Sequence, residues 1–283
     1  MSKRWKWLAI GLGVGALVVL ERLRPLREPR EPGAERVGRN LAIGLIGAAA
    51  TAVCELPVVG PVHGLAERRH LGLLRWLGLP RTLRVILGFL LLDYTLYLWH
   101  WMAHRSPWLW RFHAVHHLDR DLDSSTGVRF HFAELALSVG LRAAQALLIG
   151  VDRDTFRVYQ QALFLSVLFH HSNLELPIEV ERGLATFVVT PRMHGIHHST
   201  RPEQTNTNYS SFLSFWDRMH GTVRLNVAQR GIEIGVSGFT RPDDLTLERS
   251  LALPFERDPR LLPAPPAGGR VQAPVGDVER PRP

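Results

Sequence analysis

The sequence predicts an all-α protein, a polytopic bundle of membrane helices that carries a histidine-rich helical cap. Three observations support this fold class. Several long stretches of the chain are apolar around most of their helical circumference. Eight of the 14 histidines gather in residues 100–117 and 194–198, near the ends of these stretches and in the polar segments beside them. Ser-Pro and Thr-Pro pairs, which favour the start of a helix, precede two of the histidine clusters.

The composition excludes several classes of protein. The 283 residues include 34 Lys and Arg against 26 Asp and Glu, a net charge of +8. The positive residues are mostly Arg, are spread along the chain, and form no zinc-finger, RRM or homeodomain pattern, so we expect no nucleic-acid partner. The single cysteine, Cys54, excludes a disulfide framework and any zinc or iron–sulfur site built mainly on thiolates.

Five apolar segments are predicted to cross or enter a membrane. They are residues 7–20, 41–62, 85–103, 133–151 and 156–169. The first follows three basic residues and lacks a small-residue cleavage site, so it is predicted to be an uncleaved anchor. No segment is a clean run of about 18 apolar residues, the usual threshold for a span. With a mean hydropathy of −0.02, a soluble helical protein with buried helices is the alternative.

The topology follows from the histidine clusters, which must lie on one side of the membrane if they act together. Segments 133–151 and 156–169 then form a hairpin that turns near residues 150–153. Because Arg is frequent after residue 170, the positive-inside rule places this side in the cytoplasm. Segment 61–84 also carries five Arg, although simple counting of the membrane segments places it on the opposite, outer side. An interfacial helix beside a re-entrant segment would resolve the conflict.

We expect four regions along the chain. Residues 1–39 form an N-terminal membrane anchor and an Arg- and Pro-rich connector, and residues 40–84 form a second membrane segment and an interfacial region. Residues 85–225 contain the histidine clusters and form the core. Residues 226–283 are a C-terminal extension. From about residue 251 the extension is rich in Pro and Arg and is predicted to be disordered, because such a composition cannot bury a core.

Eight histidines fall into three motifs with helical spacing. They are His100 and His104; His113, His116 and His117; and His194, His197 and His198. Spacings of three and four residues bring side chains to one face of a helix. Ser106-Pro107 and Thr190-Pro191 precede the second and third motifs, and a Ser or Thr N-cap followed by Pro is a favoured helix opening. The motifs are therefore predicted to lie on helices.

This pattern of imidazoles indicates a metal site. Neutral imidazole is a good ligand for zinc, copper, iron and nickel. A catalytic zinc ion uses about three protein ligands, so eight histidines are too many for one ion and fit two. The sequence lacks His-Glu-x-x-His, which argues against a zincin protease. His63, His70 and His220 stand apart and are expected to be ordinary core or surface residues.

Beyond these motifs, residues 85–225 resemble the fatty acid hydroxylase/sterol desaturase superfamily of membrane-bound non-haem di-iron enzymes. The matching text is Asp93-Tyr94, His100 to Arg105, Trp110-Arg-Phe-His113-Ala-Val-His116-His117, His171-Ser-Asn173, Thr190-Pro-Arg-Met-His194-Gly-Ile-His197-His198-Ser199, Asn208-Tyr209 and Trp216-Asp-Arg-Met-His220-Gly221-Thr222. The resemblance covers about half of the chain, and its motifs follow the order of the family.

The resemblance implies an O2-dependent oxidation of an unactivated C–H bond in a lipid, by hydroxylation or desaturation, at two iron ions on the cytosolic face. It implies that the metal ligands are His100, His104, His113, His116, His117, His171, His194, His197 and His198, with His131 as a further candidate. His171 is preferred to its neighbour His170 because the family's His-x-Asn spacing starts there. His220 stands where the family often has Phe, so we do not expect it to bind metal.

The resemblance also implies partners. The substrate is a lipid, and fatty acid, sterol, ceramide, carotenoid and ether lipid all stay open. No cytochrome b5-like His-Pro-Gly-Gly segment occurs in the sequence, so electrons are expected from a separate protein, which would be cytochrome b5-like, a ferredoxin or a reductase.

Polar residues near the motifs are candidates for orienting the ligands. A ligating imidazole usually donates its second N–H to a carboxylate or a carbonyl, and Asp93, Asn173, Asn208 and Asp217 are placed to accept it. Asp93 is the strongest of the four, because an ionisable group inside an apolar segment is functional by default.

Two other functions stay open. One is a non-enzymatic membrane protein that binds or transports metal, and the other is a soluble histidine-rich zinc hydrolase. A transporter would place its ligands along a path through the bilayer midplane, whereas these motifs lie near segment ends and in polar stretches.

Overall fold

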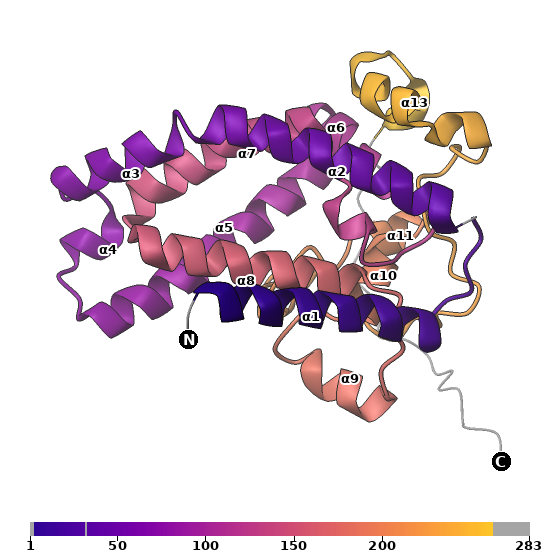
Figure 1. Ribbon diagram of the computed structural model, residues 1–283, viewed down its shortest axis with the longest axis horizontal. Helices are drawn as coiled ribbons and strands as arrows, with labels where there is room; N and C mark the ends of the chain where they lie inside the picture. The colour runs from indigo at the N-terminus through magenta and orange to yellow at the C-terminus, as the bar shows by residue number, and fades with distance from the viewer. Residues whose placement is uncertain (1–2, 32, 263–283) are drawn as a thin grey trace.

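The computed structural model describes residues 3–31 and 33–262, and this part of the chain is helical, with isolated β-bridges but no strand (Figure 1). The predicted all-α class is confirmed. The five long helices are α1 (Lys3–Leu23), α2 (Gly33–Glu55), α5 (Arg81–Arg105), α7 (Phe132–Ala144) and α8 (Arg153–His171). The shorter α-helices are α3 (Val59–Arg68), α4 (Leu73–Trp76), α6 (Pro107–His117), α9 (Ile178–Leu184), α10 (Pro191–His197), α11 (Pro202–Thr205), α12 (Phe215–Met219) and α13 (Leu247–Ala252).

The bundle has two distinct ends (Figure 1). Helices α3 and α4 lie at one end, which we call the far end. Helices α6, α10 and α11 lie at the other, which we call the histidine end. Helix α2 packs on α7, and α5 packs on α8. Because α5 and α8 run toward the histidine end, their last residues meet α6 and α10 there.

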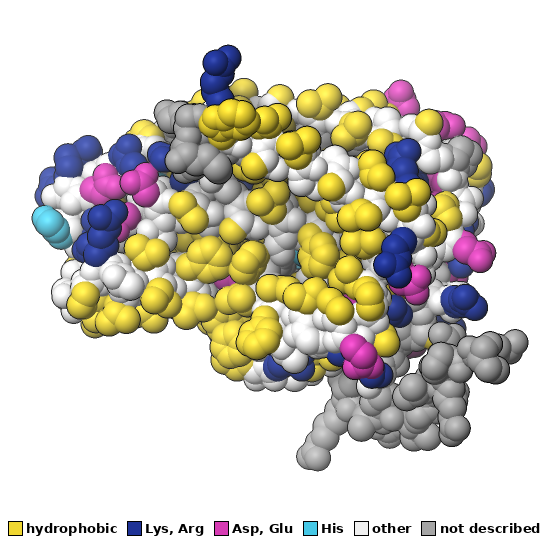
Figure 2. Space-filling view, turned by 60° about the horizontal axis from the view of Figure 1, so that its bottom comes forward, with side chains coloured by type: hydrophobic (Ala, Val, Ile, Leu, Met, Phe, Trp, Pro, Cys, Tyr) yellow, Lys and Arg dark blue, Asp and Glu magenta, His cyan; other side chains and the backbone are white. Residues whose placement is uncertain are grey.

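Three stretches are long and apolar enough to cross a membrane. They are Gly33–Trp76, Arg81–Arg105 and Phe132–Ile149, and they overlap the predicted segments 41–62, 85–103 and 133–151. Helices α1 and α8 do not reach this standard. Helix α1 carries charged residues at both ends, and α8 combines charged residues with two Gln and two His, so that it is not apolar enough. Figure 2 shows apolar side chains covering the middle of one face, while acidic and basic side chains gather toward its ends. By the length and composition of its helices, the chain is an integral membrane protein.

The predicted hairpin is confirmed. Helix α7 continues into a π-helical turn, η2 (Gln145–Ile149), and the chain reverses at Gly150 before α8. Gly150 has a φ of 74°, which glycine adopts readily. A Cβ atom on Gly150 would lie 2.8 Å from the Leu71 carbonyl oxygen. The glycine therefore lets this turn touch the α3–α4 turn at the far end.

The Arg-rich segment 61–84 lies at the far end, in α3, α4 and the start of α5. Basic residues thus occur at both ends of the bundle, and counting them does not orient it. Trp76 and Leu77 are exposed beside these Arg residues, a combination typical of a helix at a membrane interface.

One predicted boundary falls inside a helix. The division between residues 39 and 40 cuts α2, which begins at Gly33. Arg36, assigned to the polar connector by its composition, is buried and donates to Asp119 at 2.8 Å. The partner lies more than 80 residues away in the chain, so local composition carried no sign of it.

Residues 251–262 also differ from the prediction of disorder. They form the end of α13 and two short 3-10 turns, η4 (Leu253–Phe255) and η5 (Pro259–Leu261). Leu253 and Leu261 are buried against Trp110 and Leu118 of the histidine end. The prediction of disorder failed because it rested on the Pro- and Arg-rich composition, whereas these two leucines are enough to anchor the segment. The rest of the predicted tail, 263–283, lies outside the described residues.

Candidate metal centre

Four helices bring histidines to one place. His100 and His104 lie in the last turns of α5, and His171 ends α8. The other two motifs occupy α6 and α10, and the predicted helix starts are confirmed. The Ser106 hydroxyl accepts a hydrogen bond from the Leu109 N–H at 3.4 Å, and the Thr190 hydroxyl accepts one from the Met193 N–H at 3.3 Å. These caps fix where each histidine helix begins.

The histidines form two groups. Within each group, the ring nitrogens that could bind a metal ion all lie within 4.8 Å of one another. The five-histidine group contains His100, His104, His113, His117 and His197, and the four-histidine group contains His116, His171, His194 and His198. All nine side chains are buried. The structure thus brings together the nine histidines that the sequence singled out, and leaves His131 outside both groups.

Most of these rings are fixed by a hydrogen bond at Nδ1. His100 donates to the Tyr209 carbonyl at 2.6 Å, and His197 donates to the Thr207 carbonyl at 2.7 Å. His113 donates to the Glu134 carboxylate at 2.8 Å. In each of these rings Nε2 is buried with no hydrogen-bond partner in the described part of the chain. A ligating histidine is oriented in the same manner, with one nitrogen fixed and the other presented to the ion.

Two rings of the four-histidine group, His116 and His171, show the same arrangement. Nδ1 of His116 and of His171 each face a backbone carbonyl, which can only accept, so both carry hydrogen. In a neutral ring Nε2 then holds a lone pair. Yet the two Nε2 atoms lie 3.0 Å apart. Two lone pairs cannot make a hydrogen bond, so this geometry fits a cation between the rings.

Burial keeps the imidazoles of His116, His171 and His197 neutral. It lowers the pKa of His197 to about 3 and that of His171 to about 4, and it holds the pKa of His116 well below the ordinary value of 6.5. Desolvation is the main cause in each case, because a charged ring is costly in a water-poor site. Neutral rings are the form that binds metal.

Glu134 contacts a histidine of the site, and the sequence did not single it out. It lies in the first turn of α7, 21 residues from its partner His113. One carboxylate oxygen accepts from His113, and the other is buried with no partner in the described chain. A carboxylate in the first turn of an apolar segment was the available signal.

The four residues predicted to orient the ligands lie one layer further out. Asp217 accepts from the N–H groups of Tyr209 and Ser210, and Asn208 bonds the Met193 and Arg224 backbone. They fix the loop whose carbonyls hold His100 and His197. Asp93 bonds Tyr159, Trp216 and the Leu213 N–H, and Asn173 bonds the backbone of Arg27. Backbone carbonyls occupy most of the positions that the prediction gave to side chains.

The other histidines have different surroundings. His131 caps α7 by accepting from the Ala133 N–H, and its second nitrogen faces the Leu251 carbonyl. His170 is buried with its ring centre 4.2 Å from that of His194, yet belongs to neither group. His220 is exposed and stacks on Tyr94 and Tyr97.

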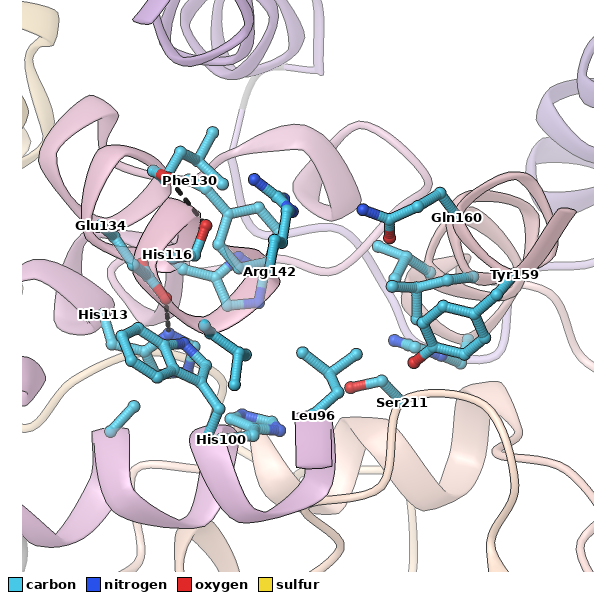
Figure 3. Close-up of a pocket in the computed structure, with 18 of the residues that line it drawn as sticks. Leu96, His100, His113, His116, Phe130, Glu134, Arg142, Tyr159, Gln160 and Ser211 are labelled. Atoms are coloured by element: carbon cyan, nitrogen blue, oxygen red, sulfur yellow. Dashed lines mark hydrogen bonds and ion pairs between the residues drawn. The ribbon is translucent and has the colours of Figure 1, made fainter. Parts of the chain in front are cut away.

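A cavity of about 170 Å³ adjoins both groups. His100, His113, His116 and His171 line one part of it. Its walls are mainly apolar and include Leu96, Phe130, Leu135, Leu163 and Val167. In Figure 3, Glu134 and His113 lie on one side of this space, and Gln160 and Tyr159 lie on the other. A cavity of this kind fits an apolar chain whose carbon atoms reach the histidines.

Comparison with known proteins agrees with this site. Residues 85–222 match the family model described as fatty acid hydroxylase. The chain is 31% identical over 185 residues to an ornithine lipid hydroxylase of Rhizobium tropici, an alignment that covers 64% of this chain and 53% of the relative. It is 30% identical over 157 residues to a cholesterol 25-hydroxylase-like protein of Danio rerio, covering 51% and 58%.

A third relative is an alkylglycerol monooxygenase of Xenopus tropicalis, 32% identical over 136 residues, with 48% of this chain and 29% of the relative covered. The alignments thus span about half of the first two relatives and less of the third. No solved structure matches the chain.

Proposed function

Because residues 85–222 belong to the fatty acid hydroxylase family, we propose that this chain is a membrane enzyme that uses O2 and two iron ions to hydroxylate a lipid. The observation that carries the proposal is the pair of adjoining histidine groups, five and four residues in size. In the first group every Nε2 atom is buried without a hydrogen-bond partner in the described chain, and in the second the Nε2 atoms lie 3.0 to 3.1 Å from one another. Nine imidazole donors suit two ions of a redox metal.

The two groups would hold one ion each. Bound there, the iron pair would supply the redox chemistry by which one oxygen atom of O2 enters a C–H bond and the other leaves as water, with two electrons and two protons delivered from outside. The protein contributes the rest. Glu134 and the carbonyls of Thr207 and Tyr209 fix the orientation of the rings that they bond, which preserves the spacing of the nitrogen donors.

The cavity would position the substrate. Leu96, Leu135 and Leu163 line it together with His113 and His116, so an apolar segment of a lipid would lie against the histidines. Positioning of this kind decides which carbon reacts. Hydroxylation is favoured over desaturation because the relatives are named hydroxylases and monooxygenases.

We also propose that the histidine end faces the cytoplasm and receives electrons there from a separate protein, either cytochrome b5-like, a ferredoxin or a reductase. The motifs lie at the ends of α5 and α8, beside polar segments, where a soluble donor can approach. A protease-protection assay on membrane vesicles tests this orientation. Cleavage sites introduced after residue 220 should be cut from the cytoplasmic side only.

The enzyme proposal is tested by metal content together with lipid analysis. Protein reconstituted with iron without oxygen is expected to hold two irons per chain, and cells that make it should accumulate a lipid that has gained one oxygen atom. His113→Ala should lose iron and the product. His220→Ala, at an exposed histidine outside both groups, is the control and should keep both. Full lipid oxidation by His113→Ala would contradict the proposal.

A further inference from the structure

The cavity beside the histidines has a second, polar end. Arg142 and Gln160 line it there, on α7 and α8. Arg142 lies eight residues beyond Glu134 on α7, which is about 12 Å along a helix. Gln160 lies eleven residues before His171 on α8, which is about 16 Å. Figure 3 shows the Gln160 amide pointing toward Arg142, across the cavity from His113. Metal binding needs neither residue.

Arg142 occupies an unusual position. It lies within the membrane-spanning stretch Phe132–Ile149 and pairs with Glu55 of the stretch Gly33–Trp76, Nη1 to Oε2, at 3.0 Å. Both side chains are mostly buried. Charged groups at such depth are costly and mark substrate or ion pathways. Since the two charges compensate each other, the pair presents donors and acceptors to the cavity without a net charge.

A second cavity continues from this point. It has a volume of about 430 Å³ and lies between α2, α3 and α8. Gln160 lines both cavities, and Glu55 lines the second one, so the Arg142–Glu55 pair stands at their junction. Gln160 has no hydrogen-bond partner in the described part of the chain, which leaves its amide available to a ligand.

His63 gives an independent sign of a ligand. It lines the second cavity and is 97% buried, yet neither ring nitrogen has a hydrogen-bond partner in the described chain. Its only close ring contact among these residues is the edge of Phe156, with centroids 5.0 Å apart. Buried polar groups in native proteins are nearly always satisfied. A polar ligand in this cavity would satisfy this one.

We propose that this junction binds an uncharged polar group of the substrate, a hydroxyl or an amide, at a fixed distance from the carbon that is oxidised. Glu55 and Gln160 supply acceptors, and Arg142, Gln160 and His63 supply donors. A charged group would have to break the Arg142–Glu55 pair, whereas a neutral one need not. The apolar cavity between the junction and the histidines takes the hydrocarbon segment. The substrate class is therefore a long-chain amphiphile with a neutral polar end, and its depth of insertion selects the reacting carbon.

This inference rests on the proposed function for the reaction, but its test does not depend on turnover. The full chain is mixed with 1-octadecanol or with octadecane, two probes that differ only in the polar group, and the probe retained is counted by native mass spectrometry. One hydrogen bond changes affinity by about tenfold. We expect the protein to retain the alcohol about ten times more strongly than the alkane.

Two variants remove the polar end. Gln160→Leu deletes the free amide, and the double substitution Glu55→Met with Arg142→Met replaces the ion pair without leaving a lone buried charge. Both are expected to lose the preference for the alcohol. Gln161→Leu, at the exposed neighbouring position on α8, is the matched control and should keep it. A protein without the preference, or a preference that survives in both variants, overturns the inference.

Regiochemistry separates this inference from the proposed function. If the protein hydroxylates a lipid at one carbon, Gln160→Leu is expected to spread the oxygen over several carbons while its iron content stays unchanged. A single position of oxygenation in both Gln160→Leu and the double variant counts against the inference alone. Absence of iron and of oxygenated lipid in the unmodified protein counts against the proposed function, and the binding experiment still decides the inference.

Discussion

Glu134 provides the most direct test of how the proposed metal site works. Its carboxylate accepts from His113 at 2.8 Å, and the two side chains are only 9% and 4% exposed. A hydrogen bond to a charged group contributes about 1.5 to 3 kcal/mol, which corresponds to a ten- to hundredfold change in an equilibrium constant. We therefore expect Glu134→Leu to weaken metal binding by about ten- to hundredfold, the range usual for a residue that orients a ligand.

The assay is competition for iron against a chelator of known affinity, with Ser138→Ala as the control. Ser138 lines the same cavity one turn further along α7, and its hydroxyl bonds the Leu135 carbonyl of its own helix. Thermal unfolding of the metal-free proteins checks that both variants fold. Iron affinity of Glu134→Leu equal to that of Ser138→Ala would refute the reasoning. Glu134→Gln should fall between them, since its amide oxygen can still accept from His113.

Three further predictions concern stability, each measured by thermal unfolding in detergent. Asp119→Ala removes the buried carboxylate that accepts from Arg36, Asn40 and Thr126, although Arg36 keeps its ion pair with Asp123, and should lower the free energy of unfolding by about 3 kcal/mol. Asp243→Ala, at an exposed site, should change it by less than about 0.5 kcal/mol, and equal effects of the two substitutions would contradict this. Because the folded pKa values of His171 and His197, about 4 and about 3, lie below the ordinary 6.5, the metal-free protein should keep its full stability above pH 6.5 and lose it as the pH falls toward 3; a Tm that stays constant down to pH 4 would show that these rings are not buried. Leu253→Ala should cost about 3 kcal/mol, since that side chain is fully buried, whereas Leu262→Ala, 69% exposed, should cost almost nothing; a Tm unaffected by Leu253→Ala would mean that residues 251–262 do not pack as described.

The part of the site that follows from helical periodicity could be predicted from the sequence. Ser106-Pro107 and Thr190-Pro191 start their helices as local capping rules require. The hairpin of α7 and α8 likewise follows from two apolar segments and a glycine.

The groups that hold the rings could not be found in this way. Glu134 lies 21 residues from His113, and their contact depends on how α6 and α7 pack. The other acceptors are backbone carbonyls of Thr207, Tyr209, Arg129 and Val167. Every residue has a carbonyl group, so no side chain in the sequence marks those that face a histidine. The prediction chose nearby polar side chains, and these fix the loop instead of the rings.

The division of the histidines into two groups explains why the His-x-x-His-His motif occurs twice. On a helix, a residue four positions on is rotated by about 40° from the first, whereas one three positions on is rotated by about 60° the other way. The outer pair therefore faces one direction and the middle histidine another. On α6 the pair His113 and His117 enters the five-histidine group and His116 the other; on α10 the pair His194 and His198 enters the four-histidine group and His197 the first.

Each of these two helices thus contributes to both groups, with their roles exchanged. His100 and His104 of α5 complete the five-histidine group, and His171 of α8 completes the four-histidine group. Because α6 and α10 bridge the groups, the separation between them depends on how these two short helices pack, more than on the long membrane helices. Under the proposed function, the caps and hydrogen bonds that fix α6 and α10 would therefore set the distance between the two ions that these groups would hold.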